Sequence, residues 1–202
     1  MPHLPKVPEH FVKMALAKAH AMDGPNYNLD RYNSSYLDRQ LIRDGKTIGS
    51  RYQYAMTMDT EWEAWVDQNI MQDYHNTGVR VSVGRPGDSY HGAHVDSQHD
   101  PTQPTYKLYY LLDRGGDAAE TCFYWEKGQP IERSSLWGNP TKCDDYSKLE
   151  IMERVRLPMQ EWVLLNTGIL HGVENVTGSR VNLTVVMSGN QVVWNCKFKK
   201  GS

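Results

Sequence analysis

The chain is poor in cysteine and in net charge, and it lacks internal repeats and low-complexity segments. Its 202 residues include three cysteines, Cys122, Cys143 and Cys196, whose odd number and spacing suit neither a disulfide framework nor a zinc site. A formal charge of −2, with both signs interspersed, provides no electrostatic footprint for nucleic acid. A hydrophobic content of 39% without a composition shift predicts one core, and so a single domain over residues 1–202.

Long hydrophobic runs are also missing. The N-terminal segment from Met1 to Lys6 has no apolar h-region, and Lys18 and His20 interrupt the apolar stretch after Met14. We therefore expect a cytoplasmic protein, in a reducing setting and without a membrane partner.

Helical periodicity is confined to the N-terminal third. A helix is predicted from Pro8 to about Met22. A second is predicted from Thr60 to about His75, because Thr60 and Glu63 have capping-box spacing and apolar side chains recur at helical intervals: Trp62, Val66, Ile70 and Tyr74. The polar, tyrosine-rich stretch 27–46 between them is expected to be irregular. Residues 1–75 are thus predicted to support and cover a sheet.

The rest of the chain, residues 76–200, has the pattern of short β-strands. Apolar alternation or β-branched and aromatic content predicts strands at 79–83, 106–113, 121–125, 149–157, 161–166, 180–188 and 191–198. Many short strands separated by Gly, Pro, Asn and Asp favour a sandwich or jelly roll. The connection 126–148 is unusually long, so it is either a lid over a cleft or a solvated insertion.

Three residues have the chemistry of a metal site. His94 and Asp96 stand two positions apart, so on an extended segment both side chains project to the same side. His171 would supply the third ligand from another strand. Two imidazoles and one carboxylate occupy one face of an octahedral ion and leave three adjacent positions open, which is diagnostic of non-haem Fe(II) oxygenases. Each motif alone is weak, since a lone histidine is more often a core residue; their combination carries the prediction.

Arg180 begins an alternating strand nine positions after His171. If Thr177 and Gly178 form a hairpin turn, His171 pairs with Thr184, and Arg180 and Asn182 share its face. An inward guanidinium is costly unless an anion meets it, and its planar fork suits a carboxylate. The anion we expect is the distal carboxylate of 2-oxoglutarate, whose other end can chelate iron. The alternative is a surface charge at the start of a strand.

Several further motifs carry a family resemblance. Gly87-Asp88-Ser89-Tyr90 precedes the His-x-Asp motif, and two more matching segments follow it, Tyr106-Lys107-Leu108-Tyr109-Tyr110-Leu111-Leu112 and Ala118-Ala119-Glu120-Thr121-Cys122-Phe123. From about Val79 to Gly189 the sequence resembles the Fe(II)/2-oxoglutarate-dependent dioxygenases, and it is most similar to their prolyl 4-hydroxylase-like branch. The resemblance implies a double-stranded β-helix with His94, Asp96 and His171 as iron ligands. It also implies that Tyr110 donates to the co-substrate, and Asn182 is assigned to the same pocket.

The chain also departs from the family pattern. Three residues separate Tyr90 from His94 where two are usual, which implies a β-bulge or an altered approach to the first ligand. The pair Ala118-Ala119 replaces two glycines, and Arg180 stands where collagen-type hydroxylases have lysine. None of these changes removes a metal ligand, but they leave the substrate class open.

The expected activity is hydroxylation of an unactivated C–H bond, in a peptidyl (prolyl) or free amino-acid substrate, with dioxygen consumed and succinate and CO2 released. The carboxylate of Asp96 favours hydroxylation over halogenation, which would need a small residue there. Two alternatives remain open. One is a nucleic-acid demethylase with the same iron site, which the charge pattern disfavours. The other is a non-catalytic jelly-roll binding module.

Overall fold

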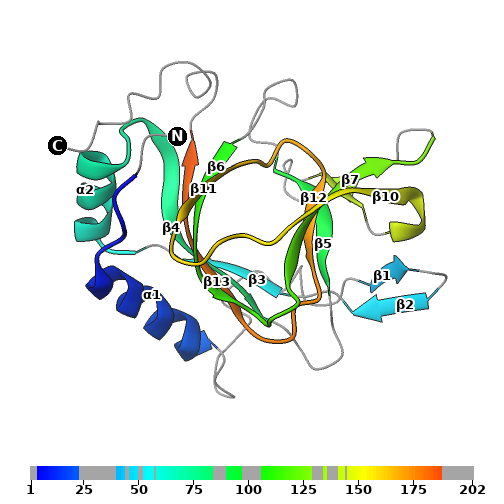
Figure 1. The fold of residues 1–202 in the computed structure, drawn as a ribbon, viewed down its shortest axis with the longest axis horizontal. Coiled ribbons are helices and arrows are strands. Elements are labelled where there is room, and N and C mark those ends of the chain that lie inside the picture. Colours follow the sequence, from blue (N-terminus) through cyan, green and yellow to red (C-terminus); the bar gives the residue numbers. More distant parts are fainter. Residues whose placement is uncertain are drawn as a thin grey trace.

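Two antiparallel sheets form the body of the protein, and two helices cover one of them (Figure 1). The computed structural model describes residues 4–22, 40–43, 46–49, 52–56, 58–83, 90–96, 106–128, 134–135, 141–143 and 145–187. The sheets face each other across a shared interior, in which Leu111 and Leu165 of one cluster with Phe123 of the other. This is a jelly roll, one of the two architectures that the strand pattern favours, in the form of the double-stranded β-helix that the family resemblance implies.

The first sheet has five strands, in the order β11 (Trp162–Asn166), β6 (Tyr106–Arg114), β13 (Arg180–Met187), β4 (Tyr74–Val83) and β3 (Tyr52–Met56). All eight residues of the central strand β13 are buried. Its odd-numbered side chains, Val181, Leu183 and Val185, join the core beneath the helices. The even-numbered residues, from Arg180 onward, therefore face the interior between the sheets.

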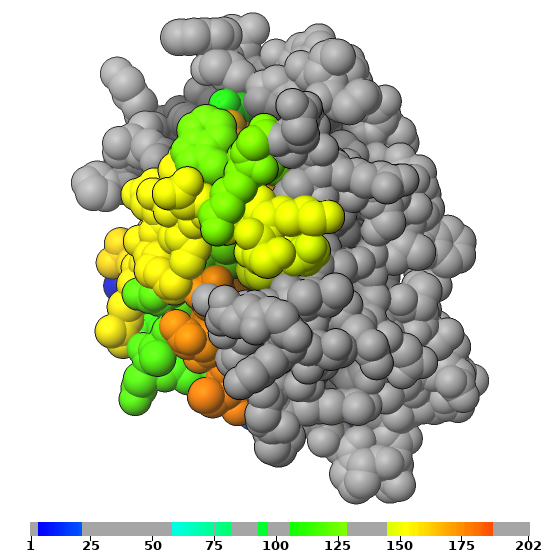
Figure 2. Space-filling model, turned by 90° about the vertical axis from the view of Figure 1, so that its right-hand side faces the viewer, coloured from blue at the N-terminus to red at the C-terminus, as the bar shows by residue number. Residues whose placement is uncertain are grey.

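The second sheet has six strands, in the order β10 (Leu149–Val155), β7 (Glu120–Glu126), β12 (His171–Glu174), β5 (Tyr90–Val95), β9 (Thr141–Cys143) and β8 (Ser134–Ser135). The short 3-10 helix η3 (Tyr146–Lys148) leads into β10. Residues of β7 and β10 lie side by side on the face shown in Figure 2, in green and yellow. A separate hairpin joins β1 (Gln40–Arg43) to β2 (Lys46–Gly49).

The helices α1 (Glu9–Met22) and α2 (Thr60–Asn69) seal the outer face of the five-stranded sheet (Figure 1). They bury an apolar stripe against it, formed by Phe11, Ala15, Ala19, Trp62 and Val66. The indole of Trp62 donates to Thr77 Oγ1 at 2.9 Å, and that hydroxyl donates to the carbonyl of Thr184 at 2.8 Å. Neither helix combines the length and the apolar character that a bilayer crossing requires.

The first helix matches its prediction, but the second is shorter than predicted. Its N-cap is Asp59, whose side chain accepts from the Trp62 backbone N–H at 2.9 Å, rather than Thr60. The helix ends at Asn69, Asp73 adopts a left-handed φ of 63°, and Tyr74 starts β4. Because tyrosine suits a strand as well as an apolar helix face, its spacing alone was misleading.

The strands β1, β2 and β3 were not predicted, nor were the short strands β8 and β9 within 126–148; β1 lies in the stretch expected to be irregular. Residues 27–39, 44 and 45 lie outside the described residues, as do 129–133, 136–140 and 144 within 126–148, Ser188 and the predicted strand 191–198. The expectations for these segments, including a lid over 126–148, stay untested.

The predicted hairpin between His171 and Arg180 is wrong. Strand β12 pairs with β5 and β7 in one sheet, whereas β13 pairs with β4 and β6 in the other. The connection crosses between sheets instead of turning back: Asn175 has a left-handed φ of 57°, and the N–H groups of Thr177 and Gly178 donate to the Gly115 carbonyl at 2.7 and 2.9 Å. Turn-forming residues thus serve an inter-sheet corner, which a local pattern cannot distinguish from a hairpin.

Candidate metal centre

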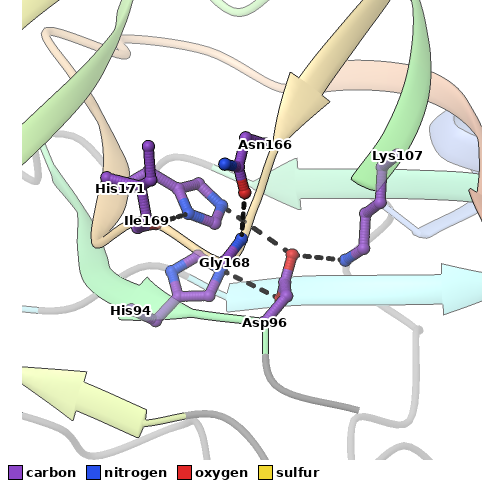
Figure 3. Close-up of polar contacts among 7 residues, drawn as sticks. All are labelled: His94, Asp96, Lys107, Asn166, Gly168, Ile169 and His171. Atoms are coloured by element: carbon purple, nitrogen blue, oxygen red, sulfur yellow. Dashed lines mark hydrogen bonds and ion pairs between the residues drawn. The ribbon is translucent and has the colours of Figure 1, made fainter. Parts of the chain in front are cut away.

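His94, Asp96 and His171 converge at one end of the interior (Figure 3). His94 lies near the end of β5 and Asp96 directly follows that strand, while His171 opens β12 opposite His94. The two imidazole rings have centroids 4.5 Å apart. The bulge predicted ahead of His94 is present, because three residue steps on β5 match two on β12 between the pairs His171–His94 and Val173–His91.

The donor atoms are spaced for one cation. Asp96 Oδ1 lies 3.6 Å from His94 Nε2, and Asp96 Oδ2 lies 3.8 Å from His171 Nε2. Ligand atoms about 2.1 Å from an ion and at right angles to one another would lie about 3.0 Å apart. The two carboxylate–imidazole separations are therefore within about 1 Å of that spacing, and all three ligand atoms lie within 4.8 Å of one another. The three residues fit a two-histidine, one-carboxylate centre.

One loop orients two of these residues. The segment between β11 and β12 supplies the Ile169 carbonyl, which accepts from His171 Nδ1 at 2.8 Å, and the Thr167 carbonyl, which accepts from the Asp96 backbone N–H at 2.9 Å. Within the loop, Asn166 Oδ1 accepts from the Gly168 N–H at 3.0 Å (Figure 3). Because a carbonyl only accepts, Nδ1 of His171 carries the hydrogen, and its Nε2 lone pair faces the site.

The electrostatics keep the donors in their metal-binding forms. Burial lowers the pKa of His171, although Asp96 opposes this, so the ring is neutral at pH 7. For Asp96, burial would raise the pKa, but the ammonium of Lys107, followed by the nearby His94 and His171, outweighs burial and holds the pKa below its usual range. A neutral imidazole and an ionised carboxylate are the species that a metal requires.

Arg180 enters the same interior from the opposite sheet. It is 4% exposed, and its Nη2 donates to Thr121 Oγ1 at 3.2 Å across the interior. In the described part of the chain no carboxylate forms an ion pair with it, and burial lowers its pKa to about 10. Thr121 lies two residues along β7 from Phe123, which is opposite His171, so the guanidinium sits about 7 Å along the strand from the metal centre.

The second residue assigned to the co-substrate pocket is buried beside Arg180. Asn182 is 3% exposed on the inward-facing side of β13, and its Nδ2 has no hydrogen-bond partner among the residues that the structure describes. A buried amide donor without a partner is costly and therefore uncommon. An anion held by Arg180 would give this amide an acceptor.

The structure does not bring Tyr110 to the site. Tyr110 faces the helix-covered core, where its ring centroid lies 5.0 Å from that of Trp162 and its hydroxyl accepts from the Val7 backbone. The inward-facing neighbour is Tyr109, which packs with the Phe123 cluster and lies within electrostatic range of Arg180. Adjacent strand residues point to opposite faces, so an offset of one position moves the tyrosine out of the pocket.

The sequence reasoning missed Lys107, whose Nζ lies 2.5 Å from Asp96 Oδ2 (Figure 3). It also missed Thr121 and Tyr109. The sequence could have indicated Lys107, because it lies two positions from Tyr109 on the same strand and therefore points to the same face, the interior. A lysine on the inward face of a largely apolar strand is uncommon and indicates a specific partner.

Comparison with known proteins gives distant structural similarity only. No protein-family model matches the chain, and no curated protein is similar in sequence. Solved structures that resemble it include a prolyl-4-hydroxylase from Pseudomonas putida, with 13% identity over 92% of this chain and 89% of that one and a TM-score of 0.44. Another is the non-haem alpha-ketoglutarate-dependent epimerase SnoN from nogalamycin biosynthesis, with 10% identity, coverages of 91% and 76% and a TM-score of 0.43. An L-ribose isomerase from Acinetobacter sp. DL28 overlaps with 10% identity, coverages of 93% and 83% and a TM-score of 0.38. These similarities assign no activity to the chain, and any assignment depends on the site itself.

Proposed function

We propose that this protein is an Fe(II)- and 2-oxoglutarate-dependent dioxygenase that hydroxylates a C–H bond of a peptidyl or amino-acid substrate. The observation that carries the proposal is the pairing of two features in one interior. A two-histidine, one-carboxylate cluster lies on one sheet, and a buried guanidinium, free of any carboxylate among the described residues, reaches in from the other. The first fits a non-haem iron, and the second fits the far end of a dicarboxylate.

His94, Asp96 and His171 would hold the iron through Nε2, a carboxylate oxygen and Nε2. When bound, the iron and 2-oxoglutarate supply the activation of dioxygen, and the co-substrate is converted to succinate and CO2 as the substrate is hydroxylated. The hydrogen bond from His171 to Ile169 fixes the ring before the metal arrives. A preset ligand lowers the cost of assembling the centre.

Arg180 and Asn182 would hold the distal carboxylate of the co-substrate. The arginine offers two parallel N–H donors, and the unsatisfied Nδ2 of Asn182 offers another. The separation of about 7 Å along the strand suits a five-carbon dicarboxylate that also reaches the metal.

Apolar side chains close the interior around these groups. The Phe123 ring centroid is 6.3 Å from that of His171, and Phe123 clusters with Leu111, Leu157 and Leu165. Exclusion of water strengthens the electrostatic interactions inside the site and limits side reactions of activated oxygen.

The substrate class within this proposal rests on the resemblance to the prolyl 4-hydroxylase-like branch. A screen for substrate-stimulated succinate formation, using proline-rich peptides, free amino acids and methylated oligonucleotides, tests it. We expect stimulation by a prolyl peptide or an amino acid, lost in Asp96→Ala. Stimulation by methylated oligonucleotides alone would replace the hydroxylase with a demethylase. Background turnover with every class would leave the prolyl assignment without support.

A further inference from the structure

Lys107 is a buried lysine that forms an ion pair with the carboxylate of Asp96. Its Nζ lies 2.5 Å from Oδ2 of Asp96, and the two side chains are only 11% and 15% exposed. The other oxygen, Oδ1, is turned toward His94 Nε2. Each oxygen of Asp96 has a ligand imidazole as neighbour, but Oδ2, which lies 3.8 Å from His171 Nε2, is also paired with the ammonium, whereas Oδ1 is not (Figure 3).

The lysine comes from a different sheet than the three ligands. It lies on β6 between Leu165 of β11 and Val186 of β13, so its ammonium crosses the interior to reach Asp96. Burying an ammonium is expensive, and Asp96 is its one ion-pair partner in the described part of the chain. Stability alone would favour an apolar residue at this inward-facing position, so the lysine is explained better by an effect on the carboxylate.

We propose that Lys107 is a positioning residue that occupies Oδ2 of Asp96, so that the carboxylate offers only Oδ1 to the metal and three adjacent coordination positions stay open. The proposal rests on the proposed function. Without the ammonium, the carboxylate is free to bind the ion through both oxygens. One of the positions required by the bidentate co-substrate and dioxygen would then be lost.

The same ammonium also lowers the affinity of the site for a metal. A unit positive charge one carboxylate away from a divalent ion repels it, and the repulsion is stronger in an interior with little water than at the surface. Removing Lys107 is therefore expected to tighten metal binding while weakening co-substrate binding to the loaded site. Simple structural damage would weaken both.

Co(II) titration of the full-length protein tests this, with visible d–d absorption as the readout and 2-oxoglutarate added afterwards. We expect Lys107→Met to bind Co(II) about tenfold or more tightly, with an altered d–d spectrum, and the loaded variant to bind 2-oxoglutarate about tenfold or more weakly. Lys107→Arg should restore the wild-type spectrum. Lys127→Met, which removes an exposed lysine, is the matched control and should leave both affinities unchanged.

An unaltered spectrum together with equal or weaker Co(II) affinity in Lys107→Met would overturn the proposal. If Lys107→Met fails to fold, the same titration is made on Lys107→Gln, because glutamine keeps a polar end without the charge. Tighter Co(II) binding by this variant supports the proposal, and unchanged or weaker Co(II) binding rejects it. A wild-type protein that does not bind Co(II), or Asp96→Ala binding it equally well, would instead remove the metal centre and with it the proposed function.

Discussion

Replacing Arg180 by methionine should make the ligand-free protein more stable while destroying its binding of 2-oxoglutarate. The guanidinium is 4% exposed, and Thr121 Oγ1 is its one hydrogen-bond acceptor among the described residues. A buried charge that lacks a counter-charge lowers the free energy of unfolding unless a ligand compensates it. An anion bound to Arg180 would therefore raise the free energy of unfolding by compensating this charge.

The size of this cost follows from the pKa. Burial lowers the pKa of Arg180 from its ordinary value of 12.5 to about 10, a gap that corresponds to about 3 kcal/mol at about 1.4 kcal/mol per pH unit. Because a depressed pKa disfavours the charged form, this cost is fully present below about pH 10 and therefore at pH 7. Loss of the hydrogen bond to Thr121 offsets about 1 kcal/mol. We expect a net gain of roughly 1 to 3 kcal/mol in Arg180→Met.

Urea unfolding of the metal-free protein measures the change, and binding of 2-oxoglutarate to the metal-loaded protein measures the loss. Arg154→Met is the matched control, because Arg154 Nη1 pairs with Glu174 Oε2 at 2.8 Å and Glu174 is 2% exposed. Removing that arginine strips a buried carboxylate of its counter-charge and should cost roughly 1 to 3 kcal/mol, since water still reaches Arg154. Destabilisation by Arg180→Met, or retained 2-oxoglutarate affinity, would refute the reasoning.

Three further changes have defined outcomes. Tyr146→Phe removes the hydroxyl that accepts from the Ala93 N–H at 2.8 Å. This should lower the free energy of unfolding in urea by about 1 to 2 kcal/mol and weaken metal binding, because Ala93 lies on β5 next to His94. Unchanged stability would contradict this. Gly115→Ala places a Cβ 2.6 Å from Val176 Cγ1 on a residue with a φ of +75°. The clash and the backbone strain should lower the free energy of unfolding by about 2 kcal/mol or more and displace Arg180. A wild-type melting temperature would contradict this. A divalent metal at about 100 times its Kd should add about 2.7 kcal/mol of stability that EDTA reverses, and a melting temperature indifferent to metal would count against the centre.

The sequence was sufficient for the fold class, the first helix and most described strands, because alternation and turn residues are local signals. It was also sufficient to place His94, Asp96 and His171 in one cluster, since His-x-Asp on a strand puts two donors on one side. The connection between sheets from His171 to Arg180 could not be predicted, because the same Thr177-Gly178 pair can form a hairpin turn or a corner between two sheets. What decides it is the Gly115 carbonyl, which is more than 60 residues away in the chain.

An error of one position along a strand explains why the wrong tyrosine was predicted. Tyr110 was chosen over Tyr109 by spacing from His94, and a single position reverses the face of a strand. Arg180 nevertheless reaches the interior, from the facing sheet rather than from the strand next to His171. Long-range pairing, which the sequence does not encode locally, determines which sheet supplies each group.

Anaerobic titration of the protein with Fe(II) and 2-oxoglutarate tests the central claim most directly. Chelation of the metal by the co-substrate should produce a weak visible charge-transfer band in the wild type, and Asp96→Ala should abolish it. A full band in Asp96→Ala, or no band in a folded wild-type protein, would contradict the account.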